Sequence, residues 1–175
     1  MPMKRMVFLF LFVVFFTISG IASQPSCAED NLSKGSVVSA LQQVPVFARL
    51  DKSQLEKLSQ AVELIQFQKG DKIIEQGKRT GRLFVVLDSE VQIRIGGALI
   101  VVLPENALVG EIEFLEDVPA SADVILNRNS RVIAIEHKAL RAVMDAHPRI
   151  GYILMDEIAR MEANRLRMND QRLQK

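Results

Sequence analysis

The sequence contains a single cysteine, Cys27, and no tryptophan among its 175 residues. One cysteine excludes a disulfide within the chain. Histidine is also scarce: His137 and His147 are the two present, and neither has a cysteine or a second histidine at ligand spacing. The sequence therefore shows neither a metal-binding pattern nor a nucleophile–base pair, and we expect a protein that is not an enzyme, without a metal or other cofactor.

Excess charge of either sign is absent too. Lys and Arg number 22 and Asp and Glu 21, which gives a net charge of +1. No overall field therefore attracts nucleic acid, and we expect no nucleic-acid partner. Hydrophobic residues make up 49% of the chain and charged residues 25%, as in a packed globular protein. The length suits one domain with an appendage.

The longest unbroken apolar run, Met6–Phe16, is too short for an ordinary membrane-spanning helix. Spanning needs roughly 20 apolar residues, whereas the apolar region of a secretory signal needs about 7–15. Lys4 and Arg5 precede the run, as expected for a signal. Residues 1–22 are thus predicted to be a signal peptide or, if the apolar stretch extends over residues 6–22 and is not cleaved, a membrane anchor.

In either case the basic residues Lys4 and Arg5 are expected to stay on the cytoplasmic side. The folded part would then be extracytoplasmic, in a periplasm or secreted, and possible contact with the membrane would run through residues 6–22. Small and polar residues follow at 23–35, including Pro25 and Gly35. We interpret this stretch as a linker.

Helical patterns come next, and then strand patterns. Ser36–Gln43 predicts a short helix, and Asp51 with Gln54 is a capping-box arrangement that starts another. Short alternating or apolar runs then predict strands at residues 65–67, 83–87, 91–95, 98–103, 124–126 and 132–135. Gly96-Gly97 is a hairpin signal between two of them. Several short strands with glycine turns predict a mainly β fold with flanking helices, a small antiparallel barrel or jelly roll over residues 36–147.

A long terminal helix is predicted for residues 148–175, because Pro148 suits a first helical turn and no breaker follows Gly151. Four apolar residues within it recur at steps of four and three: Leu154, Ile158, Met161 and, after an interruption, Met168. Such a seam is typical of two helices in contact. It predicts a homodimer or contact with a partner protein, and packing against the domain's own barrel is the alternative.

The order of these elements, together with several motifs, resembles the cyclic nucleotide-binding domain family over roughly residues 45–168. Phe67-Gln68-Lys69-Gly70-Asp71-Lys72-Ile73 is similar to the family's entry motif, and Leu83–Leu87 is similar to the strand that follows it. Gly110-Glu111-Ile112 through Pro119 and Ser121-Ala122 resembles the phosphate-binding cassette. The motifs most resemble the catabolite activator type, and we expect the protein to lack the DNA-reading helix-turn-helix of those regulators.

The resemblance implies roles for the cassette residues. Unpaired backbone N–H groups that follow Gly110 would face an anion, and glycine lets the backbone approach closely. Glu111 would accept a hydrogen bond from a ribose hydroxyl. Ser121 would donate to a phosphate oxygen, and Ile112 and Ala122 belong to the same cassette.

One position departs from the family. The family places an arginine directly after the cassette proline, opposite the cyclic phosphate, and this chain has Ala120 there. A charge-assisted hydrogen bond contributes roughly 1.5–3 kcal/mol, so its loss weakens binding by about ten- to a hundred-fold. Arg82 and Arg165 are candidates to supply the missing charge, and exposed surface positions are the alternative for both.

These observations predict an extracytoplasmic domain with a cyclic nucleotide-binding fold that has lost cyclic nucleotide binding. It would act as an interaction or structural module, with itself or another protein as partner. The alternative is a sensor that binds a cyclic nucleotide or another small anion through Gly110 and Glu111. A third interpretation is a structural subunit held at the membrane by its N-terminus.

Overall fold

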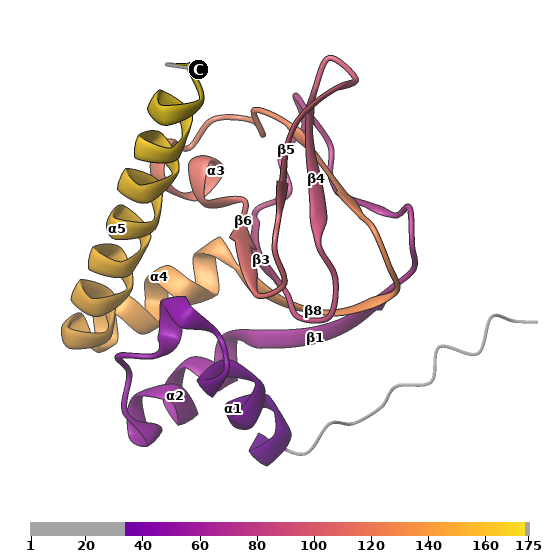
Figure 1. Cartoon of the computed structure of the whole chain (residues 1–175). Coiled ribbons are helices and arrows are strands. Elements are labelled where there is room, and N and C mark those ends of the chain that lie inside the picture. The colour runs from indigo at the N-terminus through magenta and orange to yellow at the C-terminus, as the bar shows by residue number, and fades with distance from the viewer. Residues whose placement is uncertain (1–33, 174–175) are drawn as a thin grey trace, which may run out of the picture. The chain divides into compact units, whose positions relative to one another are not determined.

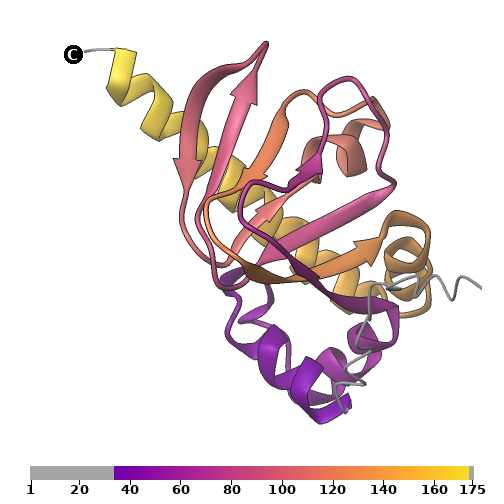
Figure 2. The same ribbon diagram turned by 90° about the vertical axis from the view of Figure 1, so that its right-hand side faces the viewer.

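The computed structural model describes residues 34–173. Within that range two four-stranded antiparallel sheets face each other as a roll, and helices cover the outer side of one of them (Figures 1 and 2). The predicted mainly β fold with flanking helices and a long terminal helix is therefore confirmed.

The two sheets are named here sheet A and sheet B. Sheet A runs in the order β1 (Val62–Phe67), β8 (Ser130–Glu136), β3 (Arg82–Val86) and β6 (Ala107–Val109). Sheet B runs in the order β2 (Lys72–Ile74), β7 (Asp123–Leu126), β4 (Val91–Ile95) and β5 (Ala98–Leu103). The hairpin between β4 and β5 turns at Gly96 and Gly97, which have φ angles of 56° and 82°. Two successive positive φ angles are what a tight hairpin turn requires, and they explain the glycine pair.

Two short α-helices and two 3₁₀ turns precede the sheets: α1 (Lys34–Gln42), η1 (Pro45–Phe47), α2 (Lys52–Leu58) and η2 (Ser59–Ala61). Helix α2 starts with the predicted capping box. The backbone N–H of Gln54 donates to the Asp51 carboxylate, and the Asp51 N–H donates to the Gln54 side chain, each at 2.9 Å. Two N–H groups that the helix itself cannot satisfy are thus paired, which fixes the helix start.

Three further helices complete the fold. The short α3 (Glu111–Glu116) lies between β6 and β7, and α4 (His137–Ala146) follows β8. The terminal α5 (Pro148–Leu173) begins at the predicted proline, packs on α4 and η1, and passes beside α3 towards its C-terminal end (Figure 1).

Sheet A is buried on both faces, so the domain has two cores. On β3, Leu83 and Val85 face the helices, whereas Phe84 and Val86 face sheet B. The same alternation follows from the period of two along β8. The helix-side core is the cluster between the helices and sheet A, and the inter-sheet core is the cluster between sheets A and B.

The terminal helix belongs to the helix-side core. Leu154 and Ile158 are buried there, and Met161 packs against the same cluster. The prediction that these residues contact a second chain must be corrected, because their apolar surface is already covered within one chain. Their four- and three-residue steps reflect one helix packing on its own domain. Met168 differs: it is 56% exposed.

The predicted signal peptide or anchor at residues 1–22 and most of the predicted linker at 23–35 lie outside the described residues, although α1 already begins at Lys34. Among residues 34–173, none of the helices combines the length and apolar character needed to cross a bilayer.

Candidate functional site

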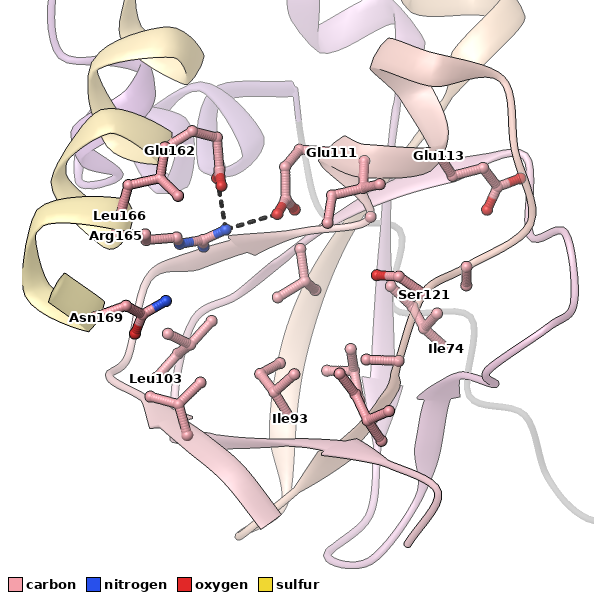
Figure 3. A pocket seen from close by; sticks show the side chains of 18 residues that line it. Ile74, Ile93, Leu103, Glu111, Glu113, Ser121, Glu162, Arg165, Leu166 and Asn169 are labelled. Atoms are coloured by element: carbon pink, nitrogen blue, oxygen red, sulfur yellow. Dashed lines mark hydrogen bonds and ion pairs between the residues drawn. The ribbon is translucent and has the colours of Figure 1, made fainter. Parts of the chain in front are cut away.

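A cavity of about 260 Å³ opens between sheet B, α3 and the last turns of α5. Aliphatic side chains form its walls, among them Ile74, Ile93, Val101, Leu103 and Val124. Polar side chains gather where α3 meets α5 (Figure 3). Every cassette residue predicted from the sequence lines this cavity: Gly110, Glu111, Ile112, Ala120, Ser121 and Ala122.

Gly110 fixes the geometry at the start of α3. Its φ is 89°, in the left-handed region that favours glycine. A Cβ at this position would lie 2.8 Å from the carbonyl oxygen of Arg82 on β3. The backbone at Gly110 therefore lies close to the neighbouring strand β3, and its approach to an anion stays a prediction. Glycine is required here for backbone conformation and for space.

Glu111 is the buried acid of the cavity. It is 5% exposed, and its Oε1 accepts a hydrogen bond from Nη1 of Arg165 at 2.6 Å. Its Oε2 is buried and has no partner among the described residues. Burial raises the pKa of this carboxyl, and the charge of Arg165 counteracts the increase without cancelling it.

Arg165 reaches the cavity from α5, as one of the two predicted substitute charges. Its Nη1 also donates to Glu162 at 2.7 Å, and its Nη2 donates to the carbonyl oxygen of Leu108 at 2.7 Å. Its charge is thus shared by two carboxylates. The other candidate, Arg82, lies outside the cavity and pairs with Glu63 at 3.2 Å and Glu136 at 3.5 Å. Arg82 does not replace the missing arginine.

Glu113, two residues after Glu111, has a different environment. Figure 3 shows its side chain directed away from the middle of the cavity. It accepts hydrogen bonds from the N–H and hydroxyl of Thr80 and from the N–H of Gly81, at 2.9–3.1 Å. Burial alone would raise its pKa, but these hydrogen bonds outweigh burial and the pKa lies below its ordinary value. Glu113 thus holds the β2–β3 loop onto α3.

Ala120 occupies the place where the family pattern has arginine, and it lines the cavity. Its backbone is fixed on the β2–β3 loop: its carbonyl accepts from Gly77 N–H at 2.8 Å and its N–H donates to the Lys78 carbonyl at 2.9 Å. Among the described residues that line the cavity, Arg165 is the sole cation, and the carboxylates of Glu111 and Glu162 both contact it. The site therefore carries an excess of negative charge.

Asp123, at the start of β7 and two residues after Ser121, is not among the residues that line the cavity. Its carboxylate accepts from the backbone N–H of Gln76 at 2.7 Å and pairs with Lys72 at 2.9 Å. The Gln76 hydrogen bond and then the Lys72 interaction lower its pKa. Asp123 joins β7 to β2, and it adds no repulsion inside the site.

Sequence reasoning missed three residues that α5 contributes to the site: Glu162, Leu166 and Asn169. They flank Arg165 at helical spacing, so an expectation for Arg165 could have included them. The aliphatic wall from β4 and β5 was predicted as two strands. Which of its faces meets the cavity depends on how the sheet packs, and the local pattern does not give this.

Comparisons with known proteins address the fold of the chain. Residues 64–147 match the model of the cyclic nucleotide-binding domain. The cAMP-dependent protein kinase regulatory subunit of Mycosarcoma maydis is 26% identical over 140 residues, which cover 71% of this chain and 26% of that protein. The chain spans about a quarter or less of the length of the curated relatives it matches.

Two solved structures illustrate the likeness of the fold. A cyclic nucleotide-binding domain from Methylobacillus flagellatus KT has a TM-score of 0.69 at 14% identity, covering 79% of this chain and 81% of that one. The regulatory subunit of a cAMP-independent protein kinase A from Trypanosoma cruzi, bound to guanosine, has a TM-score of 0.56 at 20% identity, covering 63% and 40%. Both resemble the two-sheet roll and flanking helices described above, and the cavity lies beside the segment where the family's cassette is expected. Residues 64–147 of this chain belong to the cyclic nucleotide-binding domain family.

Proposed function

We propose that the protein is a non-catalytic interaction module that has the cyclic nucleotide-binding fold but does not respond to cyclic AMP or cyclic GMP. One observation carries the proposal: the cavity has Ala120 where a phosphate would need a cation, and its single guanidinium, Arg165, is already paired with the carboxylates of Glu111 and Glu162. A cyclic phosphate would enter a low-dielectric site with no free positive charge, and that desolvation is unfavourable without a partner.

The pairing of Arg165 strengthens this argument. To meet a phosphate, Arg165 would have to give up Glu111, Glu162 or the Leu108 carbonyl. Glu111 would then be a buried carboxylate with neither oxygen paired, a state that costs several kcal/mol. A ligand phosphate would therefore exchange the ion pair between Arg165 and Glu111 for one between Arg165 and the phosphate, and Glu111 would be left unpaired.

A partner protein is part of the proposal. The curated relative is named as a regulatory subunit, which makes it a component of an assembly. One apolar surface available to a partner lies on α3 and on the last turns of α5, where Ile112, Leu115, Leu166 and Met168 are exposed; β5 carries another, with Leu99, Ile100 and Val102 exposed. A second copy of the chain or a different protein would cover such a surface.

The proposed location is extracytoplasmic, with the apolar run of residues 6–16 as a cleaved signal or as an anchor. The basic residues Lys4 and Arg5 before the run support this orientation. Mass spectrometry of the native N-terminus tests it: a start near Ser23 or Glu29 indicates a cleaved signal, and an intact Met1 or Pro2 indicates an anchor.

Isothermal titration of the full chain in mild detergent with cyclic AMP and cyclic GMP tests the loss of nucleotide response. We expect no binding tighter than hundreds of micromolar. Micromolar affinity for either nucleotide would overturn the proposal.

Sedimentation of the same preparation tests the surface on α3 and α5. If the module self-associates through it, Leu166→Asp and Met168→Asp should each shift it towards monomer, because both side chains are exposed and their replacement leaves the cores intact. Exposed Tyr152→Asp, near the start of the same helix, is the matched control and should change nothing.

A small-ligand sensor is the second candidate function, and one observation favours it. The cavity is lined by a buried acceptor, Glu111 Oε2, that has no partner among the described residues. A preformed apolar pocket with a few polar groups is the usual form of a ligand site.

A further inference from the structure

Each sheet ends in two edge strands, and within residues 34–173 three of these four edges are protected. An edge strand presents backbone N–H and C=O groups that can pair with another chain, and a short strand or a charged side chain opposes this. Strands β2 and β6 have three residues each, and β1 carries Glu63. Lys72 lies on β2, and Arg165 already donates to the Leu108 carbonyl on β6. These three edges are therefore poor sites for a further strand.

Strand β5 differs from the other three edges. Its six residues, Ala98–Leu103, include neither a charge nor a proline. Among the described residues its backbone pairs with β4 alone, and Figure 2 shows β5 at the left-hand edge of the sheets. A bulge at Ile100, which has no partner on β4, is the one protective device on this strand. β5 is thus an open edge of ordinary strand length.

The side chains of β5 make the outer face of this edge apolar. Leu99 and Val102 pair with Arg94 and Gln92 of β4, and cross-strand partners lie on the same face of a sheet. Val101 lies on the other face, where it lines the cavity. Leu99 is 51% exposed and Val102 is 42% exposed. A strand added at this edge would therefore cover apolar surface and also satisfy backbone groups.

The charges at the two ends of β5 have opposite signs. Near its first residue, Arg94 donates to the Gly97 carbonyl at 2.8 Å and has no carboxylate partner among the described residues. Glu90 precedes β4 and Glu105 follows β5, so both lie at the other end of the hairpin. Arg128 pairs with Glu105, which leaves a formal charge of −1 there (two carboxylates and one guanidinium). An antiparallel neighbour with the same layout would place opposite charges together at both ends.

We propose that β5 pairs antiparallel with β5 of a second copy of this chain, so that the two copies of sheet B form one continuous eight-stranded sheet across a two-fold axis. Backbone hydrogen bonds along β5 hold the copies together, and Leu99 and Val102 cover each other's apolar surface. Identical strands do not repel each other here, because the strand carries no charge. The inference rests on the proposed function only in treating the domain as an interaction module, whose partner it names.

Sedimentation equilibrium of the full chain in mild detergent tests the pairing. One pair of six-residue strands is a small interface, so we expect a weak dimer with a Kd of about 10–100 μM. Unfolding experiments at about 1 μM then follow the monomer. A chain that stays monomeric up to about 500 μM would overturn the proposal.

A lysine on the outer face of β5 should break the dimer. Val102 is 42% exposed, so Val102→Lys opens neither core. The Kd of the dimer should rise at least about ten-fold, because a lysine on an edge strand opposes pairing. Leu115→Lys is the matched control: Leu115 lies on α3 and is 43% exposed, and its replacement should leave the Kd of the dimer unchanged.

A cysteine in the middle of β5 tests the geometry without adding a charge. In a chain that carries Cys27→Ser, Ile100→Cys should give a disulfide-linked dimer on mild oxidation, because the midpoint of an antiparallel strand lies close to its own copy across the axis. Met168→Cys in the same background is the control. Met168 is 56% exposed and Ile100 is 52% exposed, so similar accessibility should yield little cross-linked dimer at position 168.

The outcomes separate this inference from the proposed function. If Leu166→Asp or Leu115→Lys dissociates the dimer and Val102→Lys does not, the surface on α3 and α5 forms the dimer and the pairing of β5 is wrong. Cross-linking at position 168 without cross-linking at position 100 has the same meaning. A monomeric chain refutes the pairing and leaves the loss of cyclic nucleotide response standing, because calorimetry with the nucleotides tests that separately.

Discussion

The two faces of sheet A differ in how completely they are filled. The helix-side core is closed by α1, α2, α4 and α5, and its largest side chains are fully buried. The inter-sheet face is packed near β3 and β8 but gives way to a cavity where sheet B meets α3 and α5. The difference shows that alternate side chains of one strand serve different regions. On β3, one set packs in the closed helix-side core, and the other set packs in the inter-sheet core next to the cavity.

The largest expected effect comes from opening the closed face. Leu83 is 2% exposed in the helix-side core, so Leu83→Ala should lower the free energy of unfolding by about 2–5 kcal/mol. Leu99→Ala, the same change at a residue of β5 that is 51% exposed, should cost less than about 0.5 kcal/mol. Urea unfolding measures both. Equal losses would mean that burial in the helix-side core is not what makes Leu83 important for stability.

Gly110 at the edge of the cavity should show the next largest effect. Gly110→Ala adds strain at φ 89° and a contact of 2.8 Å to the Arg82 carbonyl, so we expect a loss of about 1–3 kcal/mol or more. Gly97→Ala introduces similar backbone strain at φ 82°, but the added carbon has open space around it. Its effect therefore measures the cost of the backbone conformation without the cost of a close contact. Thermal unfolding compares them. A loss at Gly97 as large as at Gly110 would show that the close approach is unimportant.

Restoring a cation tests whether the charge of the cavity sets its selectivity. Ala120→Arg should raise the affinity for cyclic AMP by about ten- to a hundred-fold, the contribution of one charge-assisted hydrogen bond. Lys78→Arg is the control. The Lys78 carbonyl accepts a hydrogen bond from the Ala120 N–H, but Lys78 does not line the cavity, so its replacement should leave the affinity for cyclic AMP unchanged. Calorimetry measures the affinity of both variants for cyclic AMP. If Ala120→Arg does not raise that affinity, the missing cation at position 120 is not what prevents binding.

The smallest effect concerns two acids in one helical turn whose pKa values shift in opposite directions. Glu113, with a lowered pKa, contributes stability that is present above its ordinary value of 4.5 and lost as the pH falls below it. Glu111, with a raised pKa, costs stability when ionised and returns it as the pH falls. Between pH 6 and 3.5, Glu113→Gln should therefore lose less stability than the native chain, and Glu111→Gln should lose more.

Thermal melts across that pH range give the result, and each variant is compared with its own melt at pH 6. Parallel curves for the native chain and both variants would contradict the opposite environments assigned to the two carboxylates.

Much of the fold could be predicted from local chemistry. The capping box at Asp51, the glycine pair at residues 96 and 97, and the proline that starts α5 each act within a few residues, and all three are present in the structure. The cassette could be located in a different way, through the resemblance of Gly110-Glu111-Ile112 and Ser121-Ala122 to the family's motif.

What could not be predicted depends on packing between distant segments. The seam of Leu154 and Ile158 gives the same pattern whether a helix packs on its own domain or on another chain, and tertiary structure decides. Arg165 lies 54 residues from Glu111 in the sequence, and nothing local shows that they meet. The opposite environments of Glu111 and Glu113 likewise arise from where Thr80, Gly81 and Arg165 come to lie.

Arg165 connects three parts of the molecule: it belongs to α5, its Nη1 holds Glu111 at the start of α3, and its Nη2 holds the Leu108 carbonyl on β6. A protein that binds the final turns of α5 and shifts them would displace this guanidinium and so weaken or strengthen its hydrogen bond to Glu111. Thermodynamic linkage then demands reciprocity: whatever such a protein does to the affinity of the cavity, an occupant of the cavity does in equal measure to the affinity for that protein.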